Sequence, residues 1–295
     1  MGDGFSMINL GELSKPATAL VKRISDAVGG LCRPWQIKRV AEAEAQAAVI
    51  RAQSDIEVTD LQRRALERFL EEEARKQENM EAITRNALPL LEESARPSDI
   101  DNDWIVNFFD KCRLVSDSEM RALWSRVLAQ ESNAPGHFSK RTVNFVSTLE
   151  KDEATLFTSL CQLCWMVGNL TPLVFNFDDD QYRKRGITFL TLKHLDSIGL
   201  ISFDAIAGTA IPKLPDAFTV FYYGEPTVLE TSRRCGDQFS LGHATLTETG
   251  KELAVICGSA PDPEFQEYIR AEWRKKGYVT RDANGQVLTD TVAGG

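Results

Sequence analysis

Apolar residues recur at three- and four-residue steps through residues 102–142, a spacing typical of amphipathic α-helices. Ser116, followed three residues later by Glu119, predicts a capping box that starts a second helix in this block. Pro135 and Gly136 then interrupt the helical pattern. The apolar residues of the two helices are Trp104, Ile105, Phe108, Phe109 and Cys112, then Met120, Leu123, Trp124, Val127 and Leu128. The 102–142 block therefore predicts a bundle of short helices joined by tight loops.

A long helix is predicted upstream of this block. Residues 35–86 contain no Gly or Pro and are rich in Ala, Glu, Arg and Gln, which favour helices. One helix of about 50 residues would be roughly 75 Å long. Its apolar stripe, Leu61, Ala65, Phe69, Met80, Ile83 and Ala87, is interrupted at residues 71–79, where only Ala74 is apolar. A strict heptad fails, so this helix needs a partner, either a second chain or the downstream bundle.

The N-terminal segment is basic and amphipathic. Residues 15–40 carry the cations Lys15, Lys22, Arg23, Arg33, Lys38 and Arg39 against a single acid, Asp26. Such a helix can lie in a membrane interface or dock on its own protein. We favour docking, because the apolar face carries no Trp or Phe before residue 35.

The second half of the chain changes character. Ser139 caps a short helix, residues 152–167 predict another, and Pro172 with Asp178 to Asp180 marks a loop. A helix at 187–197 then precedes alternating strand patterns, and Thr247 opens a further helix. The expected strands are residues 200–203, 218–223, 227–229 and 239–246, and the last helix is 262–276. This order predicts a winged-helix-like module.

The predicted fold class is mainly α, with a C-terminal α+β module. The expected segments are residues 1–34 (basic N-terminal segment), 35–94 (long helix, a candidate coiled coil), 95–172 (helical bundle), 180–280 (winged-helix-like module) and 281–295 (disordered tail).

Composition narrows the class of partner. The net charge of −9 argues against general nucleic-acid binding, which needs clustered Lys and Arg. No apolar run reaches the ~18 residues of a membrane-spanning helix, and the N-terminus lacks a signal peptide's apolar core. We therefore expect a cytoplasmic protein, with peripheral contact at the inner membrane as an option. The six cysteines are expected to be free thiols.

No catalytic constellation emerges from the motifs. Cys161 and Cys164 lie one turn apart on the predicted 152–167 helix and lack the further ligands of a zinc site. The three histidines, His137, His194 and His243, are isolated, and the phosphate-loop, dinucleotide and nucleophile-elbow motifs are missing. The alternating acids Asp99, Asp101 and Asp103 lack the rest of a calcium loop and fit a helix N-terminus. We expect no cofactor and no metal, and we favour a non-enzymatic protein.

DNA recognition by the winged-helix-like module is the main alternative. It needs a basic recognition helix and wing. The candidate helix offers only Lys193 and His194, with Arg183 to Arg185 before it and Arg233-Arg234 near the wing. This supply of cations is small, so we favour contact with protein.

The 102–142 block also carries a family resemblance. Its elements are Asp103-Trp104, Phe108-Phe109, the run SDSEMRALW (with Ser116, Glu119, Met120 and Trp124) and the run PGHFSKRT (with Pro135, Gly136, Phe138 and Ser139). With RRALERFLEEEARKQENMEAI before it and LTETGKELA after it, the chain resembles an uncharacterised bacterial family related to the abortive-infection alpha proteins. That resemblance implies a role in defence against phage and supplies no catalytic residues.

The leading hypothesis is a non-enzymatic, abortive-infection-like protein that acts through self-assembly, membrane contact or protein contact. Within the 102–142 block, only the loop 135–138 is a candidate contact point. The alternative is a winged-helix DNA-binding regulator dimerised by the long helix. A third option is an enzyme with an unrecognised site, such as a nuclease that uses the acids at 99–103.

Overall fold

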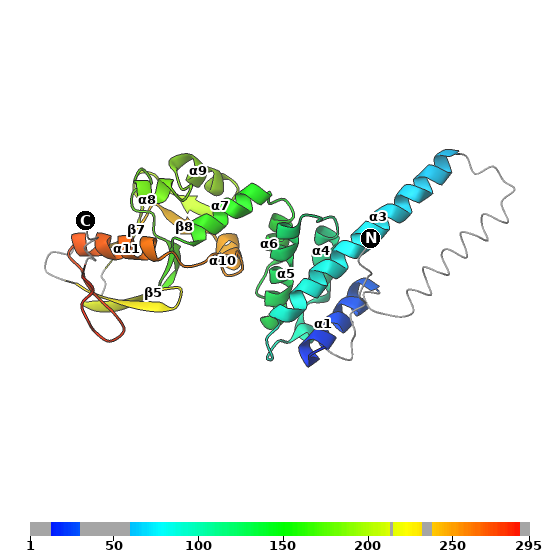
Figure 1. The fold of residues 1–295 in the computed structure, drawn as a ribbon, viewed down its shortest axis with the longest axis horizontal. Coiled ribbons are helices and arrows are strands. Elements are labelled where there is room, and N and C mark those ends of the chain that lie inside the picture. Colours follow the sequence, from blue (N-terminus) through cyan, green and yellow to red (C-terminus); the bar gives the residue numbers. More distant parts are fainter. Residues whose placement is uncertain (1–12, 30–59, 213–214, 232–237, 290–295) are drawn as a thin grey trace. The chain divides into compact units, whose positions relative to one another are not determined.

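The computed structural model describes residues 13–29, 60–212, 215–231 and 238–289. The chain divides into two compact units, residues 1–148 and 149–295, which are described separately (Figure 1). The first unit is helical and the second mixes helices with small antiparallel sheets. The mainly α class predicted from the sequence is thus confirmed.

The first unit is built from five α-helices in its described residues. They are α1 (Lys15–Ile24), α3 (Asp60–Ala87), α4 (Asn102–Cys112), α5 (Ser118–Asn133) and α6 (Lys140–Val146), with a π-turn η2 (Ser25–Gly29) and the 3-10 turns η3 (Leu88–Leu90) and η4 (Pro97–Asp99). The predicted long helix is observed over α3, and its first part lies outside the described residues. After Ala87 the chain leaves the α-helix, short of the predicted end at residue 94.

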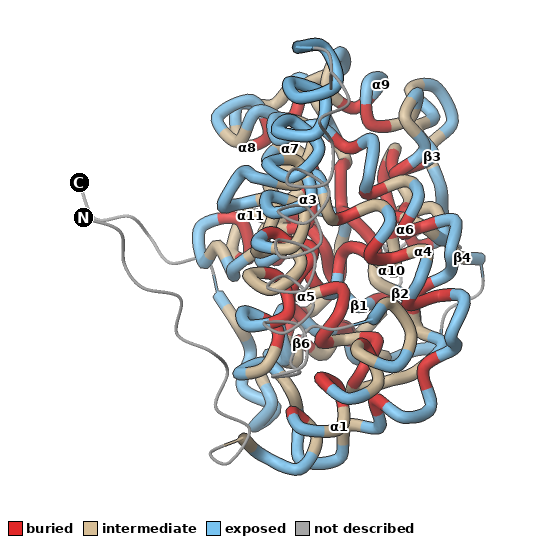
Figure 2. Tube along the Cα trace, turned by 90° about the vertical axis from the view of Figure 1, so that its right-hand side faces the viewer, coloured by how far each residue is buried: buried red, intermediate tan, exposed pale blue. Residues whose placement is uncertain are grey.

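Helix α3 has a covered half and an uncovered half. Its buried residues are Asn79, Ile83, Thr84 and Ala87, and α3 packs there mainly on α5. Residues 60–71 are all exposed, as the pale first turns of α3 show in Figure 2. In Figure 1 these turns extend past the helices that cover the other half.

The 102–142 block forms the aromatic core of this unit. Trp104 stacks on Phe108 with ring centroids 5.1 Å apart, and the Trp124 ring meets Phe108 edge-on at 5.2 Å. Phe109 and Trp124 are buried. Helices α4, α5 and α6 confirm the bundle of short helices predicted for this block.

One predicted cap lies at the wrong residue. The N-cap of α5 is Asp117, whose carboxylate accepts hydrogen bonds from the amides of Glu119 (2.9 Å) and Met120 (3.0 Å). Ser116 precedes the cap, and the predicted Ser116–Glu119 capping box does not form. Ser139 does cap α6, because its hydroxyl accepts from the Thr142 amide at 3.2 Å.

The second unit contains five helices and nine strands among its described residues. The helices are α7 (Lys151–Cys161), α8 (Asp180–Arg183), α9 (Phe189–Ser197), α10 (Glu248–Ala254) and α11 (Pro263–Lys275). The strands are β1 (Cys164–Val167), β2 (Asn169–Pro172), β3 (Ile201–Phe203), β4 (Thr209–Pro212), β5 (Ala217–Tyr222), β6 (Glu225–Glu230), β7 (Gln238–Gly242), β8 (Ala244–Leu246) and β9 (Val279–Arg281).

The strands form one larger and two smaller antiparallel sheets. The order of the five-stranded sheet is β2-β1-β5-β6-β9, while β3 pairs with β8 and β4 with β7. Its core is aromatic: the Trp165 ring lies 4.8 Å from both Tyr222 and Trp273. Thr247 and Asp262 cap α10 and α11, and these helices agree with the sequence prediction.

Two predictions in this half are wrong. The helix expected over 152–167 ends at Cys161, and its last residues form strand β1, because Trp165 packs on strand β5 and helix α11. The first part of the expected disordered tail is ordered, since Arg281 bridges to Val287 around a turn at Gly285. Residues 290–295 lie outside the described residues.

Candidate interaction surfaces

The residues of the family-like block are mostly structural. Trp104 donates its indole N–H to the Phe138 carbonyl at 2.9 Å, which ties α4 to the loop 135–138. Phe138 itself is buried. Asp101 caps α4 by accepting from the Trp104 amide at 2.9 Å, and Asp103 lies in the same first turn. These acids therefore fit a helix N-terminus, as the spacing indicated.

Sequence reasoning missed the residue that organises the loop. Glu131 on α5 is buried, and its carboxylate accepts from the amides of Gly136 (2.7 Å) and Phe138 (2.8 Å). Gly136 has a positive φ of 87°, which favours glycine at this turn. A glutamate on an apolar helix face, four residues before the Pro-Gly pair of the loop, was the available signal. With Phe138 buried, only Pro135 to His137 remain accessible in this loop.

The N-terminal cations divide into two groups. Arg23 donates to the Ile100 carbonyl at 2.7 Å and 3.2 Å, and so fastens α1 to the chain before α4. Lys15 and Lys22 are exposed on α1, whose apolar residues Ala17, Leu20, Val21 and Ile24 are buried. Arg33, Lys38 and Arg39 lie outside the described residues. The apolar face of α1 is thus covered within its own unit.

Among the described residues, no helix combines the length and the apolar character that crossing a membrane requires.

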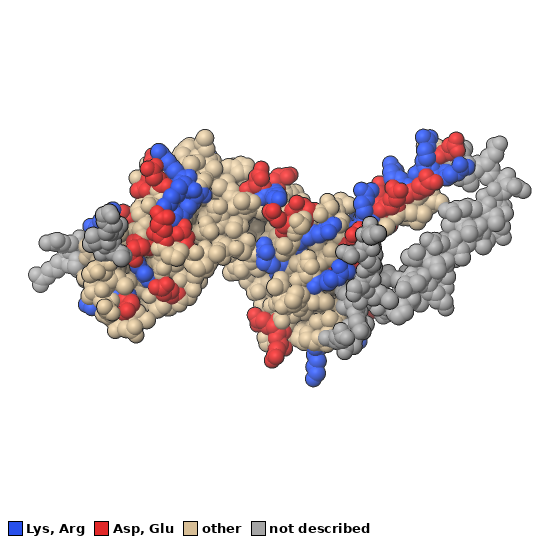
Figure 3. All heavy atoms as spheres, in the orientation of Figure 1, with Lys and Arg blue, Asp and Glu red and all other residues tan. Residues whose placement is uncertain are grey.

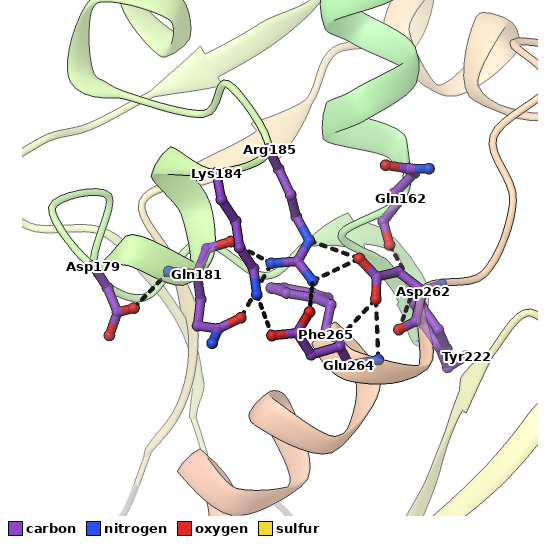
Figure 4. Close-up of polar contacts among 9 residues, drawn as sticks. All are labelled: Gln162, Asp179, Gln181, Lys184, Arg185, Tyr222, Asp262, Glu264 and Phe265. Carbon is purple, nitrogen blue, oxygen red and sulfur yellow. Dashed lines mark hydrogen bonds and ion pairs between the residues drawn. The ribbon is translucent and has the colours of Figure 1, made fainter.

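The cations at the C-terminal end of α8 are paired with acids. Arg185 is only 7% exposed, and its guanidinium meets the Asp262 carboxylate at 2.6 Å and the Gln181 side chain at 3.1 Å (Figure 4). It also lies over the Phe265 ring. Lys184 pairs with Glu264, and Arg183 with Asp178 at 3.5 Å. Basic residues that the sequence offered to DNA are therefore neutralised by acids of the same unit.

The contacts in this cluster shift the pKa values of Asp262 and Tyr222. Burial alone would raise the pKa of Asp262, yet hydrogen bonds from the Phe265 amide and from Arg185 hold that pKa below its ordinary value. Burial raises the pKa of Tyr222 to about 12, so its hydroxyl stays protonated and donates to the Gln162 carbonyl at 2.8 Å. The cluster joins α8 to the start of α11.

Helix α9 offers little free positive charge. Lys193 pairs with Asp196 at 3.1 Å, and the His194 Nε2 lies 2.9 Å from Glu153 on α7. Figure 3 shows the same mixture on the face in view, with Lys and Arg lying beside Asp and Glu. Arg233 and Arg234, near the predicted wing, lie outside the described residues.

Exposed apolar residues lie instead at the N-terminus of α9 and on the turn after β3. Leu190 is 76% exposed, and Phe189 beside it meets Phe203 with ring centroids 5.7 Å apart. Three residues after Phe203, Ile206 is 94% exposed on a turn that the Asp204 carboxylate holds by accepting from the Ile206 and Ala207 amides. We name Phe189, Leu190, Phe203 and Ile206 the α9 patch.

A second apolar surface lies on the uncovered half of α3. Its large exposed residues are Leu61, Leu66, Phe69 and Leu70. Large exposed apolar groups that gather in one place mark contact sites more often than single ones do.

Cys161 and Cys164, the pair singled out in the sequence, do not form a reactive centre. Cys161 ends α7, whereas Cys164 starts β1, so the two do not share a helix as predicted. Burial raises the pKa of Cys161 well above its ordinary value, and the neighbouring Cys164 raises it further. A thiol held protonated is a poor nucleophile.

The comparisons with known proteins identify a family whose function is not established. A family model described as "Protein of unknown function (DUF2806)" matches residues 63–270, more than half of the chain. No curated protein matches the chain. No solved structure matches it.

Proposed function

The chain belongs to the DUF2806 family, proteins of unknown function, and from its surfaces we propose that it is a non-catalytic interaction protein. The proposal rests on the charge pairing and the exposed apolar side chains of the α8–α9 region. There the cations are paired with acids, while Leu190 and Ile206 expose apolar side chains to solvent. Such a surface gains free energy by burying apolar area on another protein and gains little from phosphates.

We further propose that the second unit is a winged-helix module used for protein contact. The order of its elements supports this: α7 is followed by β1, β2, α8, α9 and β3, and β8 returns beside β3. Strands β3 and β8 pair antiparallel through Ile201–Leu246, Ser202–Thr245 and Phe203–Ala244, as the two strands beside a wing do. Strands β4 to β7 would then be an enlarged wing, and α9 would occupy the recognition position.

The biological setting we propose is abortive-infection-like defence against phage, in a cytoplasmic protein that self-assembles. Its support is the resemblance of the 102–142 block to proteins related to that class. Contact with a partner through the α9 patch would be the sensing or effector step. Membrane contact through α1 is disfavoured, because that helix buries its apolar face within the first unit.

The test is protection of cells against phage. Cells that express the wild-type chain are expected to reduce phage plating relative to an empty vector. The variant Leu190→Asp/Ile206→Asp is expected to lose this protection at equal protein level, since it places charge on the proposed contact surface.

A matched control is Val255→Asp, which changes an apolar side chain exposed to 57% in the same unit, at the C-terminal end of α10. This control is expected to protect like the wild type. Absence of protection by the wild type against a broad phage panel would contradict the defence role. Full protection by the α9-patch variant would contradict the proposed surface.

A further inference from the structure

We propose that the uncovered half of α3 is the contact surface between two copies of this chain, paired antiparallel about a centre near Glu67 and Arg68. The proposal rests on the self-assembly in the proposed function and names the surface and its geometry. It is argued from exposure, helical periodicity and charge order along residues 60–78.

The exposed apolar residues continue a face that is already used for packing. Leu61, Ala65 and Phe69 follow one another at four-residue steps, and the same face reaches Ile83 and Ala87, which are buried. In between, Lys76 pairs with Glu73 at 2.7 Å on this face. The same face therefore appears at both ends of α3, interrupted by charged residues at 71–79, and among the described residues it is covered in the last turns.

The large exposed apolar side chains of α3 indicate that another protein surface packs on them. Leu61 is 69% exposed and Phe69 57% exposed, with Leu66 and Leu70 flanking the stripe. An isolated helix of this length and polarity is marginal without packing of its apolar face. A second copy offers the same stripe, so the two surfaces are complementary by symmetry.

Charge order selects the antiparallel pairing. Along one side of the Leu61–Ala65–Phe69 stripe, α3 carries Arg64, Glu67, Arg68 and Glu71 in that order. When Leu66 faces Phe69 of the other copy in an antiparallel pair, Arg64 lies opposite Glu71 and Glu67 lies opposite Arg68. Two-fold symmetry repeats these pairs at the other end of the contact.

A parallel pair would place like charges together. Each arginine would then lie beside the same arginine of the other copy and each glutamate beside the same glutamate, which is unfavourable for close pairs. The charge sequence of α3 thus discriminates between the two orientations.

The mass of the full chain in solution, measured by light scattering at tens of micromolar, is the first experiment. The expected result is the mass of a dimer. Phe69→Asp is expected to give the monomer mass, and because Phe69 is exposed within its unit, this variant should keep its fold. Leu114→Asp changes another exposed apolar residue of the first unit, 70% exposed and located after α4, and is expected to stay dimeric.

Charge exchange tests the orientation. Arg64→Glu and Glu71→Lys should each raise the dissociation constant by about tenfold, because each replaces two symmetry-related ion pairs with like-charge contacts. The chain that carries both substitutions should return to the wild-type dissociation constant. In a parallel pair, the arginine variant would merely exchange one like-charge contact for another and would not weaken the dimer.

Each outcome decides the proposal. A monomeric wild type at tens of micromolar overturns it and indicates that another part of this chain covers the stripe. A dimer unaffected by Phe69→Asp places the contact elsewhere. A monomeric Phe69→Asp chain that still protects against phage leaves the inference standing and removes self-assembly from the proposed function.

Discussion

The 102–142 block and the α8–α9 region both combine aromatic rings with charged groups, and they use them in opposite ways. In the block, Trp104, Phe108 and Trp124 are buried, and acids serve the backbone as caps or loop anchors. Around α9, cations are cancelled by neighbouring acids while Leu190 and Ile206 remain in water. The motif that is most recognisable in the sequence is therefore a scaffold, and the available contact surface lies in less conspicuous residues.

The largest effect is expected in the core of the block. Phe108→Ala removes a fully buried ring that contacts Trp104, Phe109 and Trp124. The lost burial and the cavity should lower the free energy of unfolding by about 3–5 kcal/mol. Chemical denaturation followed by tryptophan fluorescence measures this, and a loss below about 1 kcal/mol would show that the block is not the core of its unit.

Glu131 tests whether an acid in the block is structural. Glu131→Ala leaves the Gly136 and Phe138 amides without their carboxylate partner, so unfolding should become easier by about 2–3 kcal/mol. Glu131→Gln keeps an acceptor and should cost less. Equal stability of wild type and Glu131→Ala in the same denaturation series would refute the anchoring role.

Asp262 is the corresponding test in the second unit. Asp262→Asn keeps a capping oxygen for α11 but removes the charge beside Arg185, at a cost of about 1–2 kcal/mol because the pair is only partly buried. Since the folded-state pKa of Asp262 is depressed, its contribution is present above the unfolded value of about 4 and is lost as pH falls through the folded-state pKa.

The pH series gives this prediction a second readout. Wild-type stability should fall on acidification below about pH 4, and the Asp262→Asn chain should lack this part of the decline. Parallel curves for the two proteins across that range would mean that the Asp262–Arg185 pair contributes nothing to folding.

The smallest effect on stability is expected at the α9 patch. Leu190→Asp and Ile206→Asp alter exposed side chains and should change the free energy of unfolding by less than about 0.5 kcal/mol each. Thermal unfolding of the single variants checks this. A loss above about 2 kcal/mol would show that the patch is part of the core and not a free surface.

Helix-capping residues and the alternation of apolar and polar residues predicted many of the helices and strands. Ser139, Thr247 and Asp262 start helices where cap chemistry predicts them, and the strands at β5 to β8 follow apolar and polar patterning. At α5 two adjacent residues competed for the cap, and the Asp117 carboxylate was better placed than Ser116. Local patterns decide such cases poorly because both residues are good caps.

Non-local contacts account for what the sequence could not give. Trp165 continues a helical pattern, yet its packing on Tyr222 and Trp273, far along the chain, makes it part of a strand. The Arg185–Asp262 pair spans 77 positions, so spacing could not reveal that the basic run is neutralised. The α9 patch was missed because Leu190 and Ile206 look like ordinary core residues until their exposure is known.

The most direct test of the central claim, that the α8–α9 region is a protein-contact surface, is a titration of the full chain with fluorescent duplex DNA at about 20 mM salt. The account predicts no binding at micromolar protein, because Arg183, Lys184, Arg185 and Lys193 are paired with acids. Binding that weakens steeply as salt rises, and that is lost in Arg183→Ala/Lys193→Ala, would contradict it and favour a DNA-binding regulator.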